Sequence, residues 1–348
     1  MKKVLITGSS GLIGSEAVNF FLKKKFLVFG IDNDLRSKLF GKKHSTKKFV
    51  KDQKKNKNFK FYSINLVNYQ TLENLFKKFK FDLIIHTAGQ PSHDWSAKDP
   101  VFDFKINALA TVNLLQLTKL YCSQSVFIFT STNKVYGELK PKKFKIKELK
   151  TRYEAYDKSN NLLLIDEKFP IDDTVHSPFG VSKTSADLMV QEFGKYFKIK
   201  SATFRCGCIT GPNHQGAELH GFLSYLVNCV VKNKKYKIFG YKGKQVRDNI
   251  HSYDLVKMFW EFYKRPGYGE IYNAGGGRKN SISILEAIKL TSKLINKNYK
   301  NYQILKQNRK GDHIWYITDY SKFKKKYKNW IITKDIKATI KEIIKTFY

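Results

Sequence analysis

Cysteine, proline and methionine are scarce in this sequence, and long apolar runs are absent. Its 348 residues include 4 cysteines, 7 prolines and 3 methionines. The cysteines are Cys122, Cys206, Cys208 and Cys229. Their spacing matches no metal-ligand pattern and their number is too small for a disulfide framework, so we predict reduced thiols and no metal site. No apolar run reaches the roughly 20 residues that cross a bilayer. The first one begins at Val4, with no room before it for a signal peptide, so we expect a cytoplasmic protein.

Acidic residues are few beside the basic ones. The chain has 65 lysines and arginines against 29 aspartates and glutamates, a formal charge of +36. Such a charge suits nucleic acid or an anionic membrane as a partner. The lysines are spread along the whole chain, however, so we interpret them as a solvated surface that can also attract an anionic substrate. We predict no nucleic-acid partner.

The chain opens with a pattern that predicts a phosphate-binding turn. Val4 to Ile6 form a short apolar run typical of a buried parallel strand, and Leu12 to Lys24 have helical periodicity. Gly8, Gly11 and Gly14 lie at the junction. Glycines allow a sharp turn and let a pyrophosphate approach the backbone at a helix N-terminus, where amide groups and the helix dipole favour anions.

An acidic residue after the second strand indicates which dinucleotide is bound. The apolar run Phe26 to Ile31 ends at Asp32, 24 residues after Gly8, and about 20 is typical of a ribose-binding carboxylate. Asp32 would accept hydrogen bonds from the adenosine ribose and repel a 2′-phosphate. We therefore predict NAD rather than NADP, a preference that only Arg36 weakens.

Apolar strands alternate with helical segments through the first two hundred residues, which predicts a parallel sheet with helices on both faces. The further predicted strands are Phe59–Ser63, Asp82–Thr87, Ser125–Thr130 and Ser201–Phe204, with a lysine-rich loop before the first of them. The predicted helices are Tyr69–Lys78, Val101–Leu120 and Phe179–Tyr196, and, later, Leu219–Lys232, Ile284–Asn296 and Ile336–Phe347. The fold class is α/β, a Rossmann-type doubly wound parallel sheet with a smaller C-terminal lobe that binds substrate. We place the first domain at residues 1–208, taking back segments near 249–275, and the lobe at 209–348.

Polar residues just after the strands are candidates for chemistry, because ligands of such sheets lie beyond the strand carboxyl ends. Ala88 and Gly89 are small enough to admit the nicotinamide ribose, and His93 either faces a substrate or only shapes its loop. Asn107 is an unusual polar residue in an apolar helical pattern, which simple exposure would explain. Thr132 and Lys183 are candidates for the reacting end of the site.

Several motifs in this order resemble one family. Ser131-Thr-Asn-Lys-Val-Tyr-Gly137 and His176-Ser-Pro-Phe-Gly-Val-Ser-Lys183 are similar to motifs of the extended short-chain dehydrogenases/reductases, which include the NAD-dependent nucleotide-sugar epimerases and dehydratases. Gly243-Lys-Gln-Val-Arg-Asp248 and the segment Arg309 to His313 are similar to members that epimerise a CDP-linked sugar at C2. The similarity extends over nearly the whole chain.

The resemblance implies an isomerase, expected as a homodimer or homotetramer, that oxidises C2 of the sugar transiently and reduces it again from the opposite face. It implies NAD contacts from Gly8, Gly11, Leu12, Ile13, Gly14, Asp32, Asn33, Asn65, Leu66, Thr87, Ala88, Gly89, Asn107, Thr130 and Lys183. It implies substrate contacts from Gln90, His93, Thr132, Asn133, Tyr136, Cys208, Arg247 and Arg309. In this pattern Thr132 orients the reacting hydroxyl, and the two arginines hold the pyrophosphate.

The chain departs from the family pattern where the proton acceptor is expected. The usual tyrosine, four residues before Lys183, is Phe179. Three hypotheses remain open: Tyr136 or His176 acts as the base, Lys183 itself relays the proton, or the protein binds NAD and a nucleotide sugar without turnover. Two milder departures are Asn65 in place of an aspartate and Cys208 in place of an asparagine.

Other reactions on the same scaffold are 4,6-dehydration and 4-epimerisation. Dehydration commonly uses an Asp-Glu pair directly after the threonine, and Asn133-Lys134 occupies those positions here. The sequence therefore disfavours a dehydratase.

Overall fold

The computed structural model describes residues 1–139, 144–214, 216–218, 221–307 and 313–348. The chain divides into two compact units. The first consists of Met1–Val135, Ser177–Arg205 and Leu255–Tyr272, and the second of Tyr136–His176, Cys206–Asp254 and Asn273–Tyr348. Residues 136–176, which the sequence analysis assigns to the first domain, group with the second unit.

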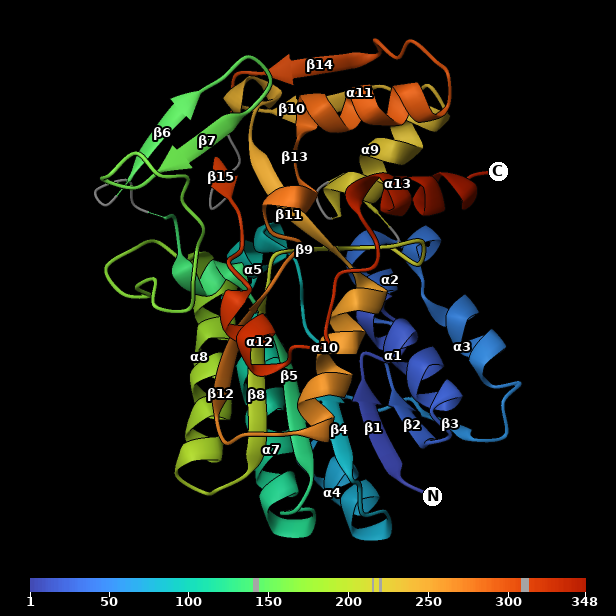
Figure 1. Ribbon diagram of the computed structural model, residues 1–348. Coiled ribbons are helices and arrows are strands. Elements are labelled where there is room, and N and C mark those ends of the chain that lie inside the picture. The colour runs from blue at the N-terminus through green and yellow to red at the C-terminus, as the bar shows by residue number, and fades with distance from the viewer. Residues whose placement is uncertain (140–143, 215, 219–220, 308–312) are drawn as a thin grey trace. The chain divides into compact units, whose positions relative to one another are not determined.

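A seven-stranded sheet forms the centre of the first unit, in the order β12-β8-β5-β4-β1-β2-β3 (Figure 1). Its strands are β1 (Lys3–Thr7), β2 (Leu27–Ile31), β3 (Phe59–Tyr62), β4 (Leu83–His86), β5 (Val126–Thr132), β8 (Lys200–Cys206) and β12 (Glu270–Ala274). β1 pairs in parallel with both β2 and β4, so the chain reverses its direction of winding there. In such sheets a ligand binds in the crevice at the reversal point. The fold is the predicted Rossmann-type α/β fold.

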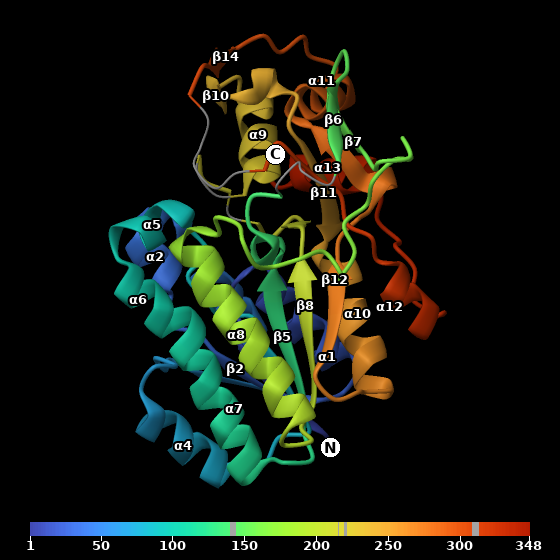
Figure 2. The same ribbon diagram turned by 90° about the vertical axis from the view of Figure 1, so that its left-hand side faces the viewer.

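Helices cover both faces of this sheet. They are α1 (Leu12–Lys23), α2 (Leu35–Phe40), α3 (Lys47–Gln53), α4 (Tyr69–Lys78), α5 (His93–Lys98), α6 (Pro100–Phe104), α7 (Ala110–Tyr121), α8 (Ser177–Lys195) and α10 (Ser252–Lys264). Figures 1 and 2 show α4, α7 and α8 on one face and α1 and α10 on the other. Trp260 of α10 packs against Phe20 and Phe21 of α1 with ring centroids 6.1 and 6.0 Å apart.

Two segments differ from the sequence prediction. The lysine-rich stretch after Asp32, predicted as a loop, contains α2 and α3. The predicted helix Val101–Leu120 is divided into α6, a π-helical turn (Lys105–Leu109) and α7. Asn107 lies in that turn and is 1% exposed, so the idea that it is simply exposed is wrong.

The second unit combines short strands with amphipathic helices. Its strands are β6 (Lys145–Glu148), β7 (Tyr153–Tyr156), β9 (Cys208–Thr210), β10 (Tyr236–Phe239), β11 (Val246–His251), β13 (Ser281–Ser283), β14 (Tyr302–Leu305) and β15 (Trp315–Tyr316). Its helices are α9 (Phe222–Val231), α11 (Ile284–Leu294), α12 (Ser321–Lys326) and α13 (Ile336–Lys345). α9, α11 and α13 enclose an apolar core that includes Leu226, Ala287 and Ile340, all fully buried.

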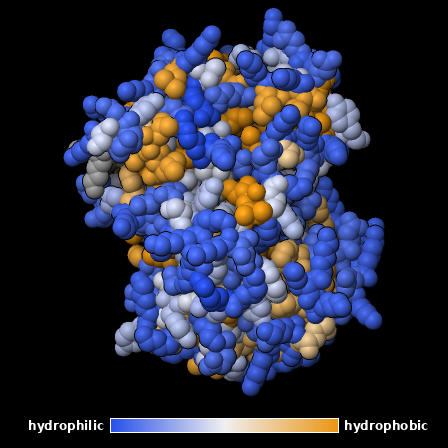
Figure 3. Space-filling model, in the orientation of Figure 1, coloured by the Kyte–Doolittle hydropathy of each residue, from blue (hydrophilic) through white to orange (hydrophobic). Residues whose placement is uncertain are grey.

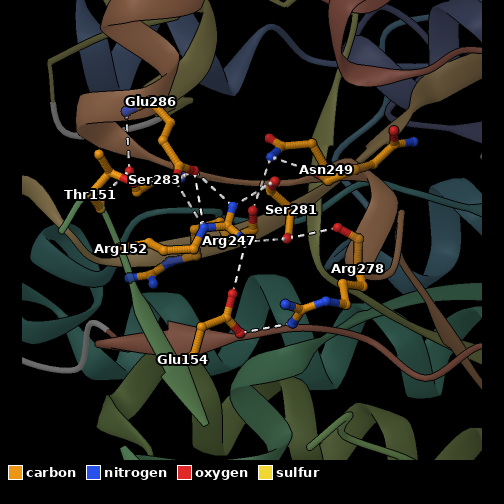
Figure 4. Close-up of polar contacts among 10 residues, drawn as sticks. Thr151, Arg152, Glu154, Arg247, Asn249, Arg278, Ser281, Ser283 and Glu286 are labelled. Carbon is orange, nitrogen blue, oxygen red and sulfur yellow. Dashed lines mark hydrogen bonds and ion pairs between the residues drawn. The ribbon is translucent and has the colours of Figure 1, made fainter. Parts of the chain in front are cut away.

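An ion-pair network joins β7 to α11 in the second unit (Figure 4). Arg152 donates from Nη2 to Glu286 at 2.7 Å and from Nη1 to Glu154 at 3.0 Å, and Arg278 donates to Glu154 at 2.8 Å. Glu286 also completes the capping box of α11 with Ser283. Burial acts to raise the pKa of Glu286, but the hydrogen bonds from Arg152 outweigh it and the pKa is lowered.

Hydrophilic residues cover most of the face drawn in Figure 3, as expected of a chain with 65 lysines and arginines. Within the described ranges, no helix is both long and apolar enough to cross a membrane. The same part of the chain contains no group of three or more histidine, cysteine, aspartate or glutamate side chains that could hold a metal ion.

Candidate active site

The glycine-rich turn after β1 is packed so closely that side chains are excluded. Gly8 has a φ of +66°, and a Cβ placed on it would lie 2.8 Å from the backbone nitrogen of Ala88. A Cβ on Gly14 would lie 2.0 Å from the carbonyl oxygen of Gly8. Gly11 is the N-cap of α1, whose first turn contains no acidic residue. Leu12 and Ile13 complete this first turn, which therefore offers backbone amides to an anion.

Asp32 is held beside this turn by two backbone amides. Its Oδ2 accepts from the Ser10 amide at 3.1 Å and its Oδ1 from the Asp34 amide at 2.8 Å. Asn33 accepts from the Leu35 amide at 3.2 Å. The carboxylate is thereby fixed at the carboxyl end of β2, next to the start of α1.

Asp34, which was not predicted as a site residue, supports Asp32 by donating its backbone amide to it. Asp34 has a left-handed backbone, with φ 53°, and its carboxylate accepts from Ser45 Oγ at 2.7 Å and from the Thr46 amide at 3.1 Å. The nearby Arg36 lies over the ring of Phe40, 5.0 Å from its centroid. Burial lowers the pKa of Arg36 to about 10, so it stays charged at neutral pH.

Hydroxyl groups tie the ends of β1, β4 and β5 together. Thr87 donates to the Thr7 carbonyl at 2.7 Å, and Thr130 donates to the His86 carbonyl at 3.0 Å. The two ring nitrogens of His86 contact Thr7 Oγ1 at 2.7 Å and Thr111 Oγ1 at 3.0 Å. Burial, aided by the charge of Lys183, lowers the pKa of His86 to about 3.

A buried polar network fixes the loop after β4 to α8. Asp103 accepts from Gln90 Nε2 at 2.7 Å, from Asn107 Nδ2 at 3.1 Å and from Ser182 Oγ. Asn107 also accepts from the Gln90 amide at 2.9 Å. Burial raises the pKa of Asp103, against the effect of these donors. Gln90 and Asn107, predicted as ligand contacts, thus use their side chains to hold the loop.

Lys183 is anchored near the carboxyl end of β5, the strand in which Thr132 is the last residue. Lys183 donates from Nζ to the Thr130 carbonyl at 2.8 Å and lies 4.2 Å from the centroid of the Phe129 ring. Thr132 Oγ1 accepts from the Lys134 amide at 3.2 Å. A Cβ on Gly89 would lie 3.8 Å from Lys183 Nζ, so the loop after β4 runs next to the ammonium group.

Three further predicted residues, Asn65, Leu66 and Asn133, belong to the first unit. Asn65 is exposed and accepts from the Val67 amide at 3.2 Å, while the carbonyl of Leu66 accepts from Asn113 at 3.1 Å. Asn133 is buried next to Thr132.

Comparison with known proteins places this arrangement in a family. The model of the NAD dependent epimerase/dehydratase family matches residues 4–275. The chain belongs to this family. It is 32% identical over 295 residues to CDP-paratose 2-epimerase of Salmonella typhi, over 83% of each chain. It is 28% identical over 299 residues to UDP-glucuronate 4-epimerase of Thermodesulfobacterium geofontis, over 85% of this chain and 81% of that one.

Solved structures share the fold. The structure of Thermus thermophilus UDP-glucose 4-epimerase in complex with NAD has a TM-score of 0.80 to this chain, at 21% identity over 99% of this chain and 98% of that one. At that identity the similarity concerns the fold alone.

NAD is the cofactor of this epimerase/dehydratase family, and the first unit fits it. The turn of Gly8, Gly11 and Gly14 leaves the backbone bare for a pyrophosphate, and the fixed carboxylate of Asp32 suits a ribose diol. Lys183 is anchored near the carboxyl end of β5, at the same edge of the sheet. The residues present are thus those that would hold the dinucleotide.

Other predicted site residues belong to the second unit. Tyr136 is 1% exposed and donates its hydroxyl proton to Asn273 Oδ1 at 2.7 Å. Arg247 is 8% exposed and donates to its neighbour's carbonyl, Val246 O, at 2.8 Å. Cys208 and His176 are half-buried. Arg309 lies outside the described residues.

Asp248, next to Arg247, makes stability depend on pH. Burial raises its pKa from 3.8 to about 6, although the amides of Gly277 and Thr318 donate to it at 3.1 and 3.2 Å. Between about pH 4 and 6 the folded protein therefore keeps a proton that the unfolded chain releases, and stability falls as pH rises, by at most about 3 kcal/mol. Urea unfolding at pH 4.5, 5.5 and 7 should show this decrease in the wild type and a smaller one in Asp248→Asn. Equal slopes in both proteins would contradict the assignment.

Proposed function

We propose that the protein is an NAD-dependent nucleotide-sugar 2-epimerase that interconverts CDP-paratose and CDP-tyvelose. The observation that carries the proposal is the position of Lys183, anchored to Thr130 beside the loop after β4, in a chain 32% identical to CDP-paratose 2-epimerase. The alternatives are another epimerisation or dehydration on this fold, or binding without turnover. Asn133-Lys134, at the positions where dehydratases commonly carry an acidic pair, speaks against dehydration.

Bound NAD supplies the capacity to oxidise a sugar carbon and to reduce it again. The protein supplies position and charge. Thr132 accepts from the Lys134 amide at 3.2 Å, and its hydroxyl, which donates to Asn133 Oδ1 at 3.4 Å, would turn to donate to the sugar oxygen instead. The ammonium group of Lys183 stabilises negative charge that develops on that oxygen and holds the ribose nearby. Arg247 and Arg309 are proposed to hold the pyrophosphate.

The test is turnover of purified protein with defined nucleotide sugars. CDP-paratose, UDP-glucuronate and UDP-glucose are supplied separately, and the products are identified by proton NMR at C2 and C4. We expect conversion of CDP-paratose at C2, with NAD bound to the purified protein. Conversion of a UDP-sugar at C4 alone would replace the proposed specificity, and no conversion of any of them would favour a binding protein.

Replacing Lys183 should separate binding from turnover. We expect Lys183→Met to lower kcat by about 100-fold or more, since positioned proton and charge donors contribute about 10²–10⁴-fold. Thr132→Val should lower it by about 10-fold or more for the same reason. Lys195→Met at the end of the same helix, where the ammonium group donates to Gln191 at 3.4 Å, is the matched control. Unchanged turnover in both Lys183→Met and Thr132→Val would contradict the assignment of these residues to the catalytic centre.

A further inference from the structure

An imidazole lies against the residue that replaces the usual tyrosine. Phe179, near the start of α8, is 8% exposed, and its ring centroid is 4.9 Å from that of His93, at an interplanar angle of 59°. Phe179 and Lys183 are four residues apart on one helix and therefore share a face. His93, from α5, therefore contacts this face of α8 at Phe179, which lies one turn before Lys183.

The orientation of His93 is fixed by a second contact. Its Nδ1 is 3.0 Å from Ser177 Oγ. Ser177 has a left-handed backbone, with φ 64°, and its Oγ also accepts from the Gly180 amide at 3.4 Å. A non-glycine residue in this region is uncommon and costs about 1–3 kcal/mol, which the surrounding structure must offset. Ser177 keeps this conformation with its hydroxyl against the imidazole.

The backbone that carries His93 is equally well held. Ser92 is the N-cap of α5 and accepts from the Trp95 amide, while its own carbonyl accepts from Gln90 at 2.8 Å. Gln90 in turn donates to Asp103, which also accepts from Ser182 of α8. His93 is therefore connected to α8 in two ways. Its ring contacts Ser177, and the backbone before it is linked to Ser182 through Gln90 and Asp103.

Phe179 has no ionisable group and cannot accept a proton from the sugar hydroxyl, whereas an imidazole can. An ordinary imidazole has a pKa of about 6.5, so near neutral pH it accepts and returns a proton readily. Tyr136, a candidate base from the sequence, donates its hydroxyl proton to Asn273 within the second unit.

We propose that His93 is the catalytic residue that accepts and returns the proton of the reacting sugar hydroxyl, and that Ser177 is its positioning residue. In the oxidative half, the O–H bond breaks and its proton passes to Nε2 of His93. The C–H bond breaks with its electron pair going to the oxidised nicotinamide, and a C=O bond forms. The second half reverses both transfers at the opposite face. This inference rests on the proposed function.

If His93 and Ser177 have only a structural role, their variants should behave differently. If the contact with Ser177 only joined α5 to α8, the loss of His93 would lower stability but would not change which protonation state is active. The test therefore needs a pH profile and a rescue in addition to a rate. The charged groups on the helices packed against α5 are Asp103 of α6 and Lys183, Asp187, Glu192 and Lys195 of α8.

The experiment compares the wild type, His93→Gln, Phe179→Tyr and the double variant as NAD-loaded proteins with CDP-paratose, from pH 5 to 9. In the wild type we expect kcat to fall on the acid side of its optimum, because a protonated imidazole cannot accept the sugar proton. His93→Gln should keep its NAD and its thermal midpoint, lose about 100-fold or more in kcat, and lose this acid limb. Adding Phe179→Tyr to His93→Gln should restore at least a tenth of wild-type kcat, with a profile set by the tyrosine.

A second pair of variants keeps the proposal testable if His93→Gln does not fold. Ser177→Ala should shift the acid limb of kcat and the NMR titration of the His93 ring protons by the same amount. Ser185→Ala, the same change at a half-buried position farther along α8, should shift neither. Wild-type turnover without an acid limb, or His93→Gln with wild-type kcat, would overturn the assignment of His93 alone. An inactive wild type would overturn the proposed function and this inference with it.

Discussion

Replacing Gly14 with alanine is expected to abolish the retention of NAD. The new Cβ would lie 2.0 Å from the Gly8 carbonyl oxygen and 2.8 Å from the Ser9 Cα. These are backbone atoms, so the turn itself must open, and overpacking of this kind costs about 1–3 kcal/mol. The measurement is the amount of NAD released from purified protein by heat, together with the urea midpoint of unfolding.

Gly11 provides the matched control. A Cβ at this position would approach only the Gly8 carbonyl oxygen, at 3.3 Å, and the residue has an ordinary φ of −71°. Gly11→Ala should therefore change the unfolding midpoint far less than Gly14→Ala and should keep part of the bound NAD. Equal losses in the two variants would mean that the close packing of Gly14 is not what shapes the site.

Removing Asp187 is expected to destabilise the protein by about 3–5 kcal/mol, because it leaves a buried arginine without its counter-charge. Arg205 donates to Asp187 from Nε at 3.1 Å and from Nη2 at 3.0 Å. The side chains are 4% and 0% exposed, so water cannot replace the lost partner. Asp187→Ala measured by urea unfolding tests this.

Two comparisons decide whether the effect belongs to the pair. Asp187→Leu combined with Arg205→Met should recover most of the loss, since apolar replacements of a buried pair are often neutral. Asp52→Ala, which breaks an exposed pair with Lys55, should leave stability almost unchanged. An Asp187→Ala protein as stable as the wild type would show that Arg205 finds other partners.

The parts of the fold and site that the sequence predicts are those with local patterns. The strand, the three glycines and Asp32 follow one another along the chain, so periodicity and spacing are enough to predict the fold class and the cofactor. Lys183 is found by a motif. The predicted boundaries of the central strands differ from the observed ones by a few residues because apolar runs mark the buried middle of a strand better than its ends.

The parts that the sequence does not predict depend on residues distant along the chain. Asp103 and Ser182 meet through the fold, with Asn107 between them in a π-helical turn that no periodicity announces. His93 and Ser177 are 84 positions apart. Local composition also misleads: the lysines around α3 suggest a loop, yet the buried Val50 and Gln53 hold a helix there.

His86 stays neutral at the pH of an ordinary enzyme assay. Its pKa of about 3 means that the hydrogen bonds joining the ends of β1 and β4 keep the same donors and acceptors throughout the pH range in which enzymes work. Titration of His86 therefore adds no step to a pH-rate profile in that range.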